Sequence, residues 1–130
     1  MKRVKLFMPV ILFTVVFYGC VYNNEEELYG NKPSDNCNTE NVTYTGIIKP
    51  ILTARCYSCH SNSAANSFGA GINLENFNEL TLKVTSGKLL GVITHSPGFQ
   101  PMPQPQGAVK LDDCSIEKIR TWINNGAKND

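Results

Sequence analysis

Two cysteines three residues apart, with a histidine directly after the second, are the residues of this sequence with the clearest chemistry. They are Cys56, Cys59 and His60, in the stretch ARCYSCHSN. Two thiols and an imidazole this close together suit a zinc clip, a redox-active dithiol or the covalent attachment of a haem of the c type. On a helical turn, residues spaced i, i+3 and i+4 lie on one side. The rest of the chain has to decide among these three sites.

Zinc and dithiol chemistry each need partners that the sequence lacks. A structural zinc site takes four ligands, usually from two cysteine pairs or from one pair and two histidines. The only histidines are His60 and His95, and no second close cysteine pair exists. A thioredoxin-like dithiol follows a strand in a βαβ pattern, and no segment has strand alternation. A haem needs only two thiols for its vinyl groups and an imidazole for its iron, so the motif favours haem attachment.

The first 19 residues have the pattern of an export signal. The basic start MKRVK precedes an uncharged apolar run, Leu6–Tyr18, and Gly19 provides a small residue before Cys20. This run is shorter than the ~20 residues of a typical membrane-spanning helix. VFYGC resembles the lipobox of bacterial lipoproteins, in which the cysteine becomes the lipid-bearing N-terminus. Phe17 stands where leucine is usual, so an uncleaved N-terminal anchor stays open. We expect a signal peptide at 1–19 and lipidation at Cys20.

Residues 20–36 are polar, acidic and interrupted by Gly30 and Pro33, which is typical of a flexible tether. The folded domain is then 37–130, exported and lipid-anchored to a bacterial membrane, facing the periplasm or the cell surface. Removal of the signal takes three of the 12 basic residues and none of the 11 acidic ones, so the mature chain is mildly acidic. Without a basic block, nothing indicates nucleic-acid binding.

All five cysteines can be assigned in an oxidising compartment. Cys20 takes the lipid, and Cys56 and Cys59 belong to the candidate haem motif. Cys37 and Cys114 remain, near the two ends of the domain, and we expect a disulfide between them. The alternative is two buried free thiols. A bridge that closes so long a loop is worth roughly 4 kcal/mol in the chain-entropy picture.

Helical periodicity recurs along the first half of the domain. In TYTGIIKPILTARC the apolar residues Ile47, Ile48, Ile51 and Leu52 form a helix face that runs into the CYSCH stretch. The proline of this segment falls within the first turn or two, where it costs least. SNSAANSFGAG is expected to be a small-residue loop. In NFNEL, the asparagine at 76 is a candidate N-cap, with a glutamate three residues later.

Two further helices complete the domain. SGKLLGVITH contains a short one, and LDDCSIEKIRTWINNGA contains the clearest one, capped by Asp112 and ended by Gly126. Its apolar stripe consists of Ile116, Ile119 and Ile123, with Trp122 at the border. Between the two, SPGFQPMPQPQGAV holds four of the seven prolines and is expected to be irregular. The predicted fold class is all-α, in one small domain.

Met102 is the only methionine that remains after the signal, because Met1 and Met8 leave with it. Prolines on both sides stiffen its loop, and a methionine in such polar surroundings is a poor core filler. Its thioether is therefore a candidate distal ligand for a haem iron that His60 holds from the other face. His95 competes for this role, although a histidine lining the pocket is the plainer interpretation.

The helix into CYSCH, the PMP loop and the closing helix with I..WI..GA resemble a small, single-domain monohaem cytochrome c, in the lipoprotein form of Gram-negative bacteria. The resemblance covers nearly the whole mature chain. It implies a cytochrome c-like fold of three to five short helices wrapped around one covalent haem c. It also implies thioether bonds from Cys56 and Cys59 and iron ligation by His60 and Met102. In that family the first and last helices cross, which would bring together Ile47, Ile51, Ile119 and Trp122.

One departure from the family concerns the histidine. Many such cytochromes have a proline soon after it, whose carbonyl fixes the imidazole through Nδ1, but none stands between His60 and Pro97. We expect another backbone carbonyl, in the Gly69–Gly71 loop, to take this part.

The resemblance implies single-electron transfer as the function. With both axial positions filled, the protein would be an electron carrier and not an enzyme. We expect a monomer that docks transiently with redox proteins; Lys83 and Lys88 are better interpreted as solvated lysines than as a docking surface. Two alternatives stay open. A labile Met102 would make the protein a small-ligand sensor or a weak peroxidase, and without haem it would be a lipoprotein binding module with a CxxC pair.

Overall fold

Seven short helical elements make up the part of the chain that the structure describes. The computed structural model describes residues 37–104 and 109–130, so the expected signal peptide, the lipid-bearing Cys20 and the tether lie outside the described residues. In chain order the elements are the π-helical turn η1 (Tyr44–Ile48), α2 (Lys49–Arg55), α3 (Tyr57–His60), α4 (Ala65–Phe68), α5 (Phe77–Thr85), α6 (Lys88–Ile93) and α7 (Asp113–Asn124). The described residues include no strand, which confirms the all-α prediction.

The helices are more numerous than the expected three to five, because the described residues form six α-helices besides η1. The difference lies within and just after the CYSCH stretch, where α3 and α4 are single turns of four residues each. The prediction of a loop at α4 was wrong. The Phe68 N–H donates to the Ala64 carbonyl at 2.9 Å and closes a helical turn there. Alanine favours a helix more than any other residue, and serine and asparagine disfavour one only weakly, so this small-residue segment can form a helical turn.

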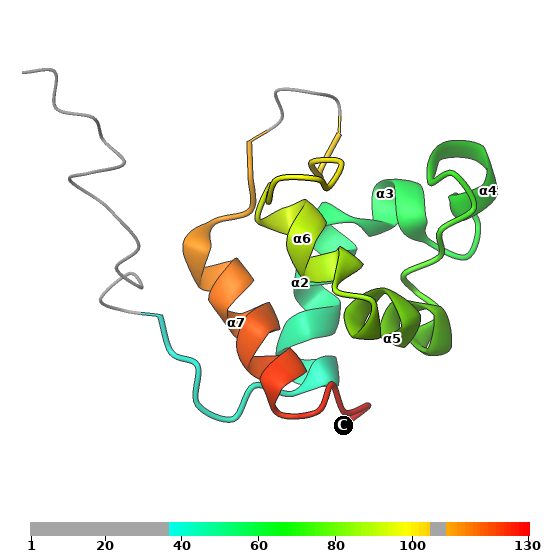
Figure 1. The fold of residues 1–130 in the computed structure, drawn as a ribbon. Coiled ribbons are helices and arrows are strands. Elements are labelled where there is room, and N and C mark those ends of the chain that lie inside the picture. The colour runs from blue at the N-terminus through cyan, green and yellow to red at the C-terminus, as the bar shows by residue number, and fades with distance from the viewer. Residues whose placement is uncertain (1–36, 105–108) are drawn as a thin grey trace, which may run out of the picture. The chain divides into compact units, whose positions relative to one another are not determined.

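The first and last helical segments lie side by side, as the resemblance implied (Figure 1). η1 packs on α7, and α6 packs on both α5 and α7. Ile119 and Trp122 of α7 are buried, and Ile47 and Ile51 are half-buried against the same cluster. Trp122, expected at the border of the apolar stripe, is more deeply buried than Ile123.

Three aromatic rings explain why Trp122 takes the central position. Tyr44 of η1 stacks on Trp122 with ring centroids 5.8 Å apart and meets Phe77 of α5 edge-on at 4.8 Å. The indole N–H of Trp122 donates to the Lys128 carbonyl at 2.9 Å, so its polar edge is satisfied. Among the described residues, the largest fully buried side chains are Trp122, Ile48, Leu52, Leu80, Leu111 and Ile119.

The N-terminus of α5 is capped as the sequence predicts, but its glutamate bonds elsewhere. The Asn76 Oδ1 accepts from the backbone N–H groups of Asn78 and Glu79. The carboxylate of Glu79 accepts from the Asn73 N–H at 3.3 Å. The glutamate therefore ties the incoming loop to the helix.

Both ends of α7 follow the sequence signals. Asp112 accepts from the Ser115 N–H at 2.8 Å, and the hydrogen bonds from Ser115 hold the pKa of this carboxyl below its ordinary value. Gly126 has φ 95°, a left-handed conformation that favours glycine. Its N–H donates to the Ile123 carbonyl and that of Ala127 to the Trp122 carbonyl, the Schellman pattern of a helix end.

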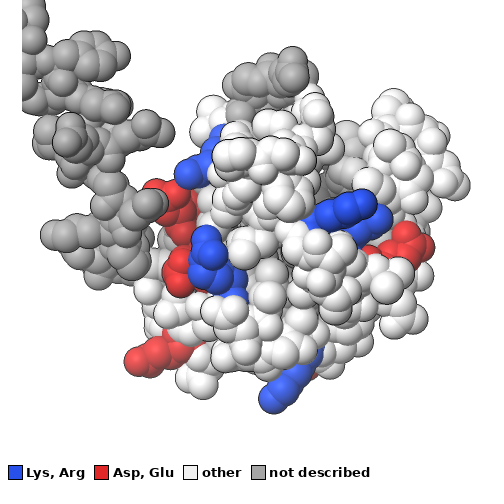
Figure 2. Space-filling view, viewed as in Figure 1, with Lys and Arg blue, Asp and Glu red and all other residues white. Residues whose placement is uncertain are grey.

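Basic and acidic side chains are interspersed on the face seen in Figure 2. Within residues 37–104 and 109–130, no helix combines the length and the apolar character needed to cross a membrane.

A disulfide bond joins Cys37 to Cys114, with Cα atoms 5.4 Å apart across 77 residues of sequence. These are the two cysteines that the assignment from sequence had paired. The bridge ties the segment before η1 to the first turn of α7.

We expect the double variant Cys37→Ser/Cys114→Ser to lose roughly 4 kcal/mol of unfolding free energy, because the open chain gains entropy mainly in its unfolded state. Urea unfolding under non-reducing conditions measures this loss. Wild-type protein treated with a reductant should unfold like the double variant. Equal midpoints for the oxidised wild type and the double variant would contradict the prediction.

Candidate functional site

The CYSCH stretch forms a tight helical turn at the end of α2. Cys56 is both the C-cap of α2 and the residue before α3. Its carbonyl accepts from the N–H groups of Cys59 at 3.1 Å and His60 at 2.9 Å. The turn therefore holds the three chemically active residues close together on one short segment.

The His60 ring is fixed by the chain segment that follows it. Its Nδ1 lies 2.9 Å from the Ile72 carbonyl oxygen, which can only accept, so Nδ1 carries the proton and Nε2 keeps its lone pair. The backbone adds a second bond, from the Leu74 N–H to the His60 carbonyl at 2.8 Å. The expectation that Gly69–Gly71 supplies the carbonyl was wrong by one residue. Left-handed backbone at Ala70 and Gly71, with φ 51° and 74°, turns the chain there, and Ile72 meets the ring.

Gly69 has a different part in the site: it leaves room for the histidine. A Cβ at this position would lie 2.5 Å from the Cys59 carbonyl oxygen and 2.8 Å from Nδ1 of His60. Both distances are shorter than real Cβ contacts allow. The residue is buried, and only a glycine permits this approach.

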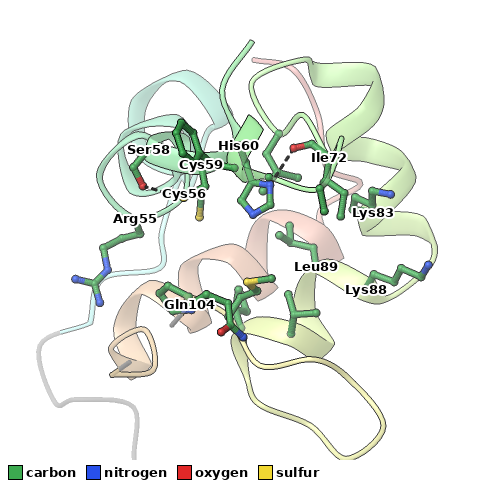
Figure 3. A pocket seen from close by; sticks show the side chains of 18 of the residues that line it. Arg55, Cys56, Ser58, Cys59, His60, Ile72, Lys83, Lys88, Leu89 and Gln104 are labelled. Atoms are coloured by element: carbon green, nitrogen blue, oxygen red, sulfur yellow. Dashed lines mark hydrogen bonds between the residues drawn. The ribbon is translucent and has the colours of Figure 1, made fainter. Parts of the chain in front are cut away.

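His60 points into a cavity of about 290 Å³ (Figure 3). Cys56, Cys59 and Met102 also line this cavity. That volume is near the lower end of the ~300–1,000 Å³ typical of small-molecule sites. The apolar side chains that line it include Phe68, Ile72, Leu74, Leu89, Val92, Ile93 and Leu111. Three cations also line it, Lys83 and Lys88 to one side in Figure 3 and Arg55 to the other, and none of its described lining residues is acidic.

Met102 is anchored through its own backbone. Its N–H donates to the Val92 carbonyl at 3.0 Å, and its carbonyl oxygen lies 2.9 Å from Nε2 of His95. Met102 lines the cavity, whereas His95 does not. The geometry therefore brings Met102, and not its competitor, into the cavity that holds His60.

The two motif cysteines are free thiols in this structure. Burial raises the pKa of Cys56 to about 11, against a weaker opposing effect of Arg55, so this thiol stays protonated near neutral pH. A redox-active CxxC pair depends on a lowered pKa. Among the described residues, no three histidine, cysteine or acidic side chains converge as a metal site would require. Neither the dithiol nor the zinc interpretation gains support.

Tyr57, the second residue of the motif, was not singled out from the sequence. Its hydroxyl is buried and has no hydrogen-bond partner among the described residues, and burial raises the pKa of this phenol. The sequence likewise did not reveal that Gly69 leaves room for the His60 ring or that the Ile72 carbonyl accepts its hydrogen bond. The glycine-rich run GAG was the only sequence signal near them.

No family model, curated protein or solved structure matches this chain. The functional inference therefore depends on the site itself.

We expect Gly69→Ala to lower the free energy of unfolding by about 1–3 kcal/mol, because the added methyl overlaps the Cys59 carbonyl and the His60 ring. Urea unfolding measures the loss, and ¹⁵N NMR of the imidazole reports whether Nδ1 keeps its hydrogen bond to Ile72.

Gly71→Ala is the matched control in the same loop. It adds strain at φ 74° but meets nothing within 4 Å. The imidazole signals should change in Gly69→Ala and stay unchanged in Gly71→Ala. Unchanged signals in both would contradict the role given to Gly69.

Proposed function

We propose that this protein is a c-type cytochrome that carries single electrons between redox proteins, with one haem c bound covalently at Cys56 and Cys59. His60 and Met102 would be the axial ligands of its iron. The observation that carries the proposal is the meeting of two free thiols, an oriented imidazole and a thioether at one mainly apolar cavity. That set of donors belongs to haem c ligation in general.

The residues around the cavity fit such a group. Its aliphatic lining suits a flat hydrophobic ring system, while Arg55, Lys83 and Lys88 suit the two propionate carboxylates that every haem of this type carries. The lack of acidic side chains among the described lining residues avoids like-charge repulsion. Polarity and charge therefore support haem as the occupant.

The two thiols can attach the group without a redox reagent. Each S–H would add across one vinyl double bond, with sulfur bonding to one carbon and hydrogen to the other. Cys56 and Cys59 are both reduced and so available for this addition. When bound, the haem iron supplies the one-electron chemistry.

The axial residues favour electron transfer over catalysis. His60 presents Nε2 because Nδ1 is used by Ile72, and this bond also raises the basicity of the ligand. Met102 would close the other face, and a thioether ligand raises the reduction potential. An iron closed on both faces has no position for a substrate, so the protein is proposed as a carrier and not an enzyme.

The proposed location follows from the N-terminal sequence. The signal pattern at 1–19 and Cys20 support export and a lipid anchor on a bacterial membrane, facing the periplasm or the cell surface. A monomeric domain on a tether could reach membrane-bound redox proteins and dock with them transiently.

The direct test is the full chain purified from a host that matures c-type cytochromes. We expect a mass increased by one haem that survives denaturation, and a c-type spectrum of the reduced protein that carbon monoxide leaves unchanged. A double variant, Cys56→Ala/Cys59→Ala, should lose the covalent mass. Bare polypeptide from the wild type would overturn the proposal and favour a lipoprotein binding module.

Met102→Leu tests the distal ligand. Leucine keeps the volume and apolar character of the side chain but cannot ligate iron, so the reduced variant should bind carbon monoxide and change its spectrum. Phe68→Leu, which alters an exposed residue of the cavity lining outside the Met102 loop, is the control and should resist carbon monoxide like the wild type. A wild type that already binds carbon monoxide would favour a sensor or weak peroxidase.

A further inference from the structure

His95 contacts the backbone of the proposed distal ligand. It follows α6 closely, in a left-handed conformation with φ 55°, and its ring reaches across the loop to the backbone of Met102. Histidine is among the residues that tolerate this conformation. Nε2 lies 2.9 Å from the Met102 carbonyl oxygen, which can only accept, so Nε2 must carry the proton.

The loop between the two residues has few other ways to hold Met102. Pro101 and Pro103 flank it and have no N–H to donate. The remaining donor in this tripeptide is the N–H of Met102 itself, which bonds to the Val92 carbonyl at 3.0 Å. The carbonyl side of Met102 therefore depends on His95.

A packing contact fixes the middle of the same loop. A Cβ on Gly91 of α6 would lie 2.6 Å from the Phe99 ring, so this ring sits directly on the helix backbone. The Phe99 N–H donates to the Ser96 carbonyl at 3.1 Å. Gln104 holds the loop on the other side of Met102, where its side-chain amide donates to the Pro101 carbonyl at 2.9 Å. The Met102 carbonyl itself is held by His95.

We infer that His95 is a positioning residue that keeps the Met102 thioether at the haem iron and so keeps outside ligands away. This inference rests on the proposed function, because it needs Met102 to be the distal ligand. Without the bond, the Met102 carbonyl would lose its only side-chain anchor among the described residues, and the thioether would spend less time at the iron. An external ligand would then compete more effectively.

The test compares three variants of the full, haem-loaded chain. His95→Asn keeps a residue that accepts the left-handed backbone but is too short to reach the carbonyl. His95→Gln returns an amide donor at a similar reach. Ser96→Ala removes the 2.7 Å contact between Thr94 and Ser96 hydroxyls without touching Met102, and serves as the control.

Imidazole binding to the ferric iron is the readout. We expect His95→Asn to bind imidazole about five- to tenfold more tightly than the wild type, the size of one hydrogen bond's net contribution. His95→Gln should recover most of the wild-type affinity, and Ser96→Ala should match the wild type. Equal imidazole affinities for His95→Asn and the wild type would overturn the positioning role while the carrier proposal stood.

Nitrogen NMR of the reduced wild type gives a readout that needs no variant. A proton on Nε2 of His95 that exchanges slowly with solvent supports the inference, and a proton on Nδ1 instead overturns it. This measurement tests the positioning role of His95 even if the His95→Asn variant fails to accumulate. A wild-type protein that lacks covalent haem or binds carbon monoxide would instead contradict the proposed function. The experiments therefore distinguish a failure of the positioning role from a failure of the carrier proposal.

Discussion

The hydrogen bond from Nδ1 of His60 to the Ile72 carbonyl, 2.9 Å long, is the constraint about which the candidate site is arranged. It selects the tautomer that leaves Nε2 available and holds the ring against rotation. The bond requires the two chain segments to lie almost in contact, which Gly69 permits by having no side chain. The Leu74 N–H then ties the segments together a second time, at the His60 carbonyl. Together these contacts orient the imidazole.

The opposite side of the cavity is built by α6 and the loop after it. Val92 supplies both a lining side chain and the carbonyl that accepts from the Met102 N–H. The two sides are held by a shared core in which Tyr44 stacks on Trp122, with a disulfide closing the chain between Cys37 and Cys114. A domain this small buries a limited core. A bound haem would add to its stability, because a ligand that binds only the folded state stabilises it.

Sequence signals predicted correctly those helix ends that depend on hydrogen bonds between residues close in sequence. Asp112 caps α7 because its carboxylate reaches a nearby N–H, and Gly126 ends that helix because its φ of 95° suits glycine. The sequence signals were misleading for side chains whose contacts lie outside their own helix. The glutamate after the Asn76 cap bonds to the incoming loop, and Trp122 is buried because rings from two other elements receive it. Periodicity cannot report such contacts, since it describes one helix at a time.

By itself the sequence determined the helical class of the domain, the residues of the CYSCH motif and the candidacy of Met102, because residue type and spacing along a few turns suffice for these. Only the tertiary structure decided that Met102 and not His95 lines the cavity, and that the Ile72 carbonyl accepts the hydrogen bond from Nδ1 of His60. Both contacts depend on where loops that are far apart in sequence fold back against the helices. The path of each loop is set by residues in the left-handed conformation, by close contacts at glycines and by single backbone hydrogen bonds. Their effect depends on residues that are distant in sequence, so the sequence pattern alone does not reveal it.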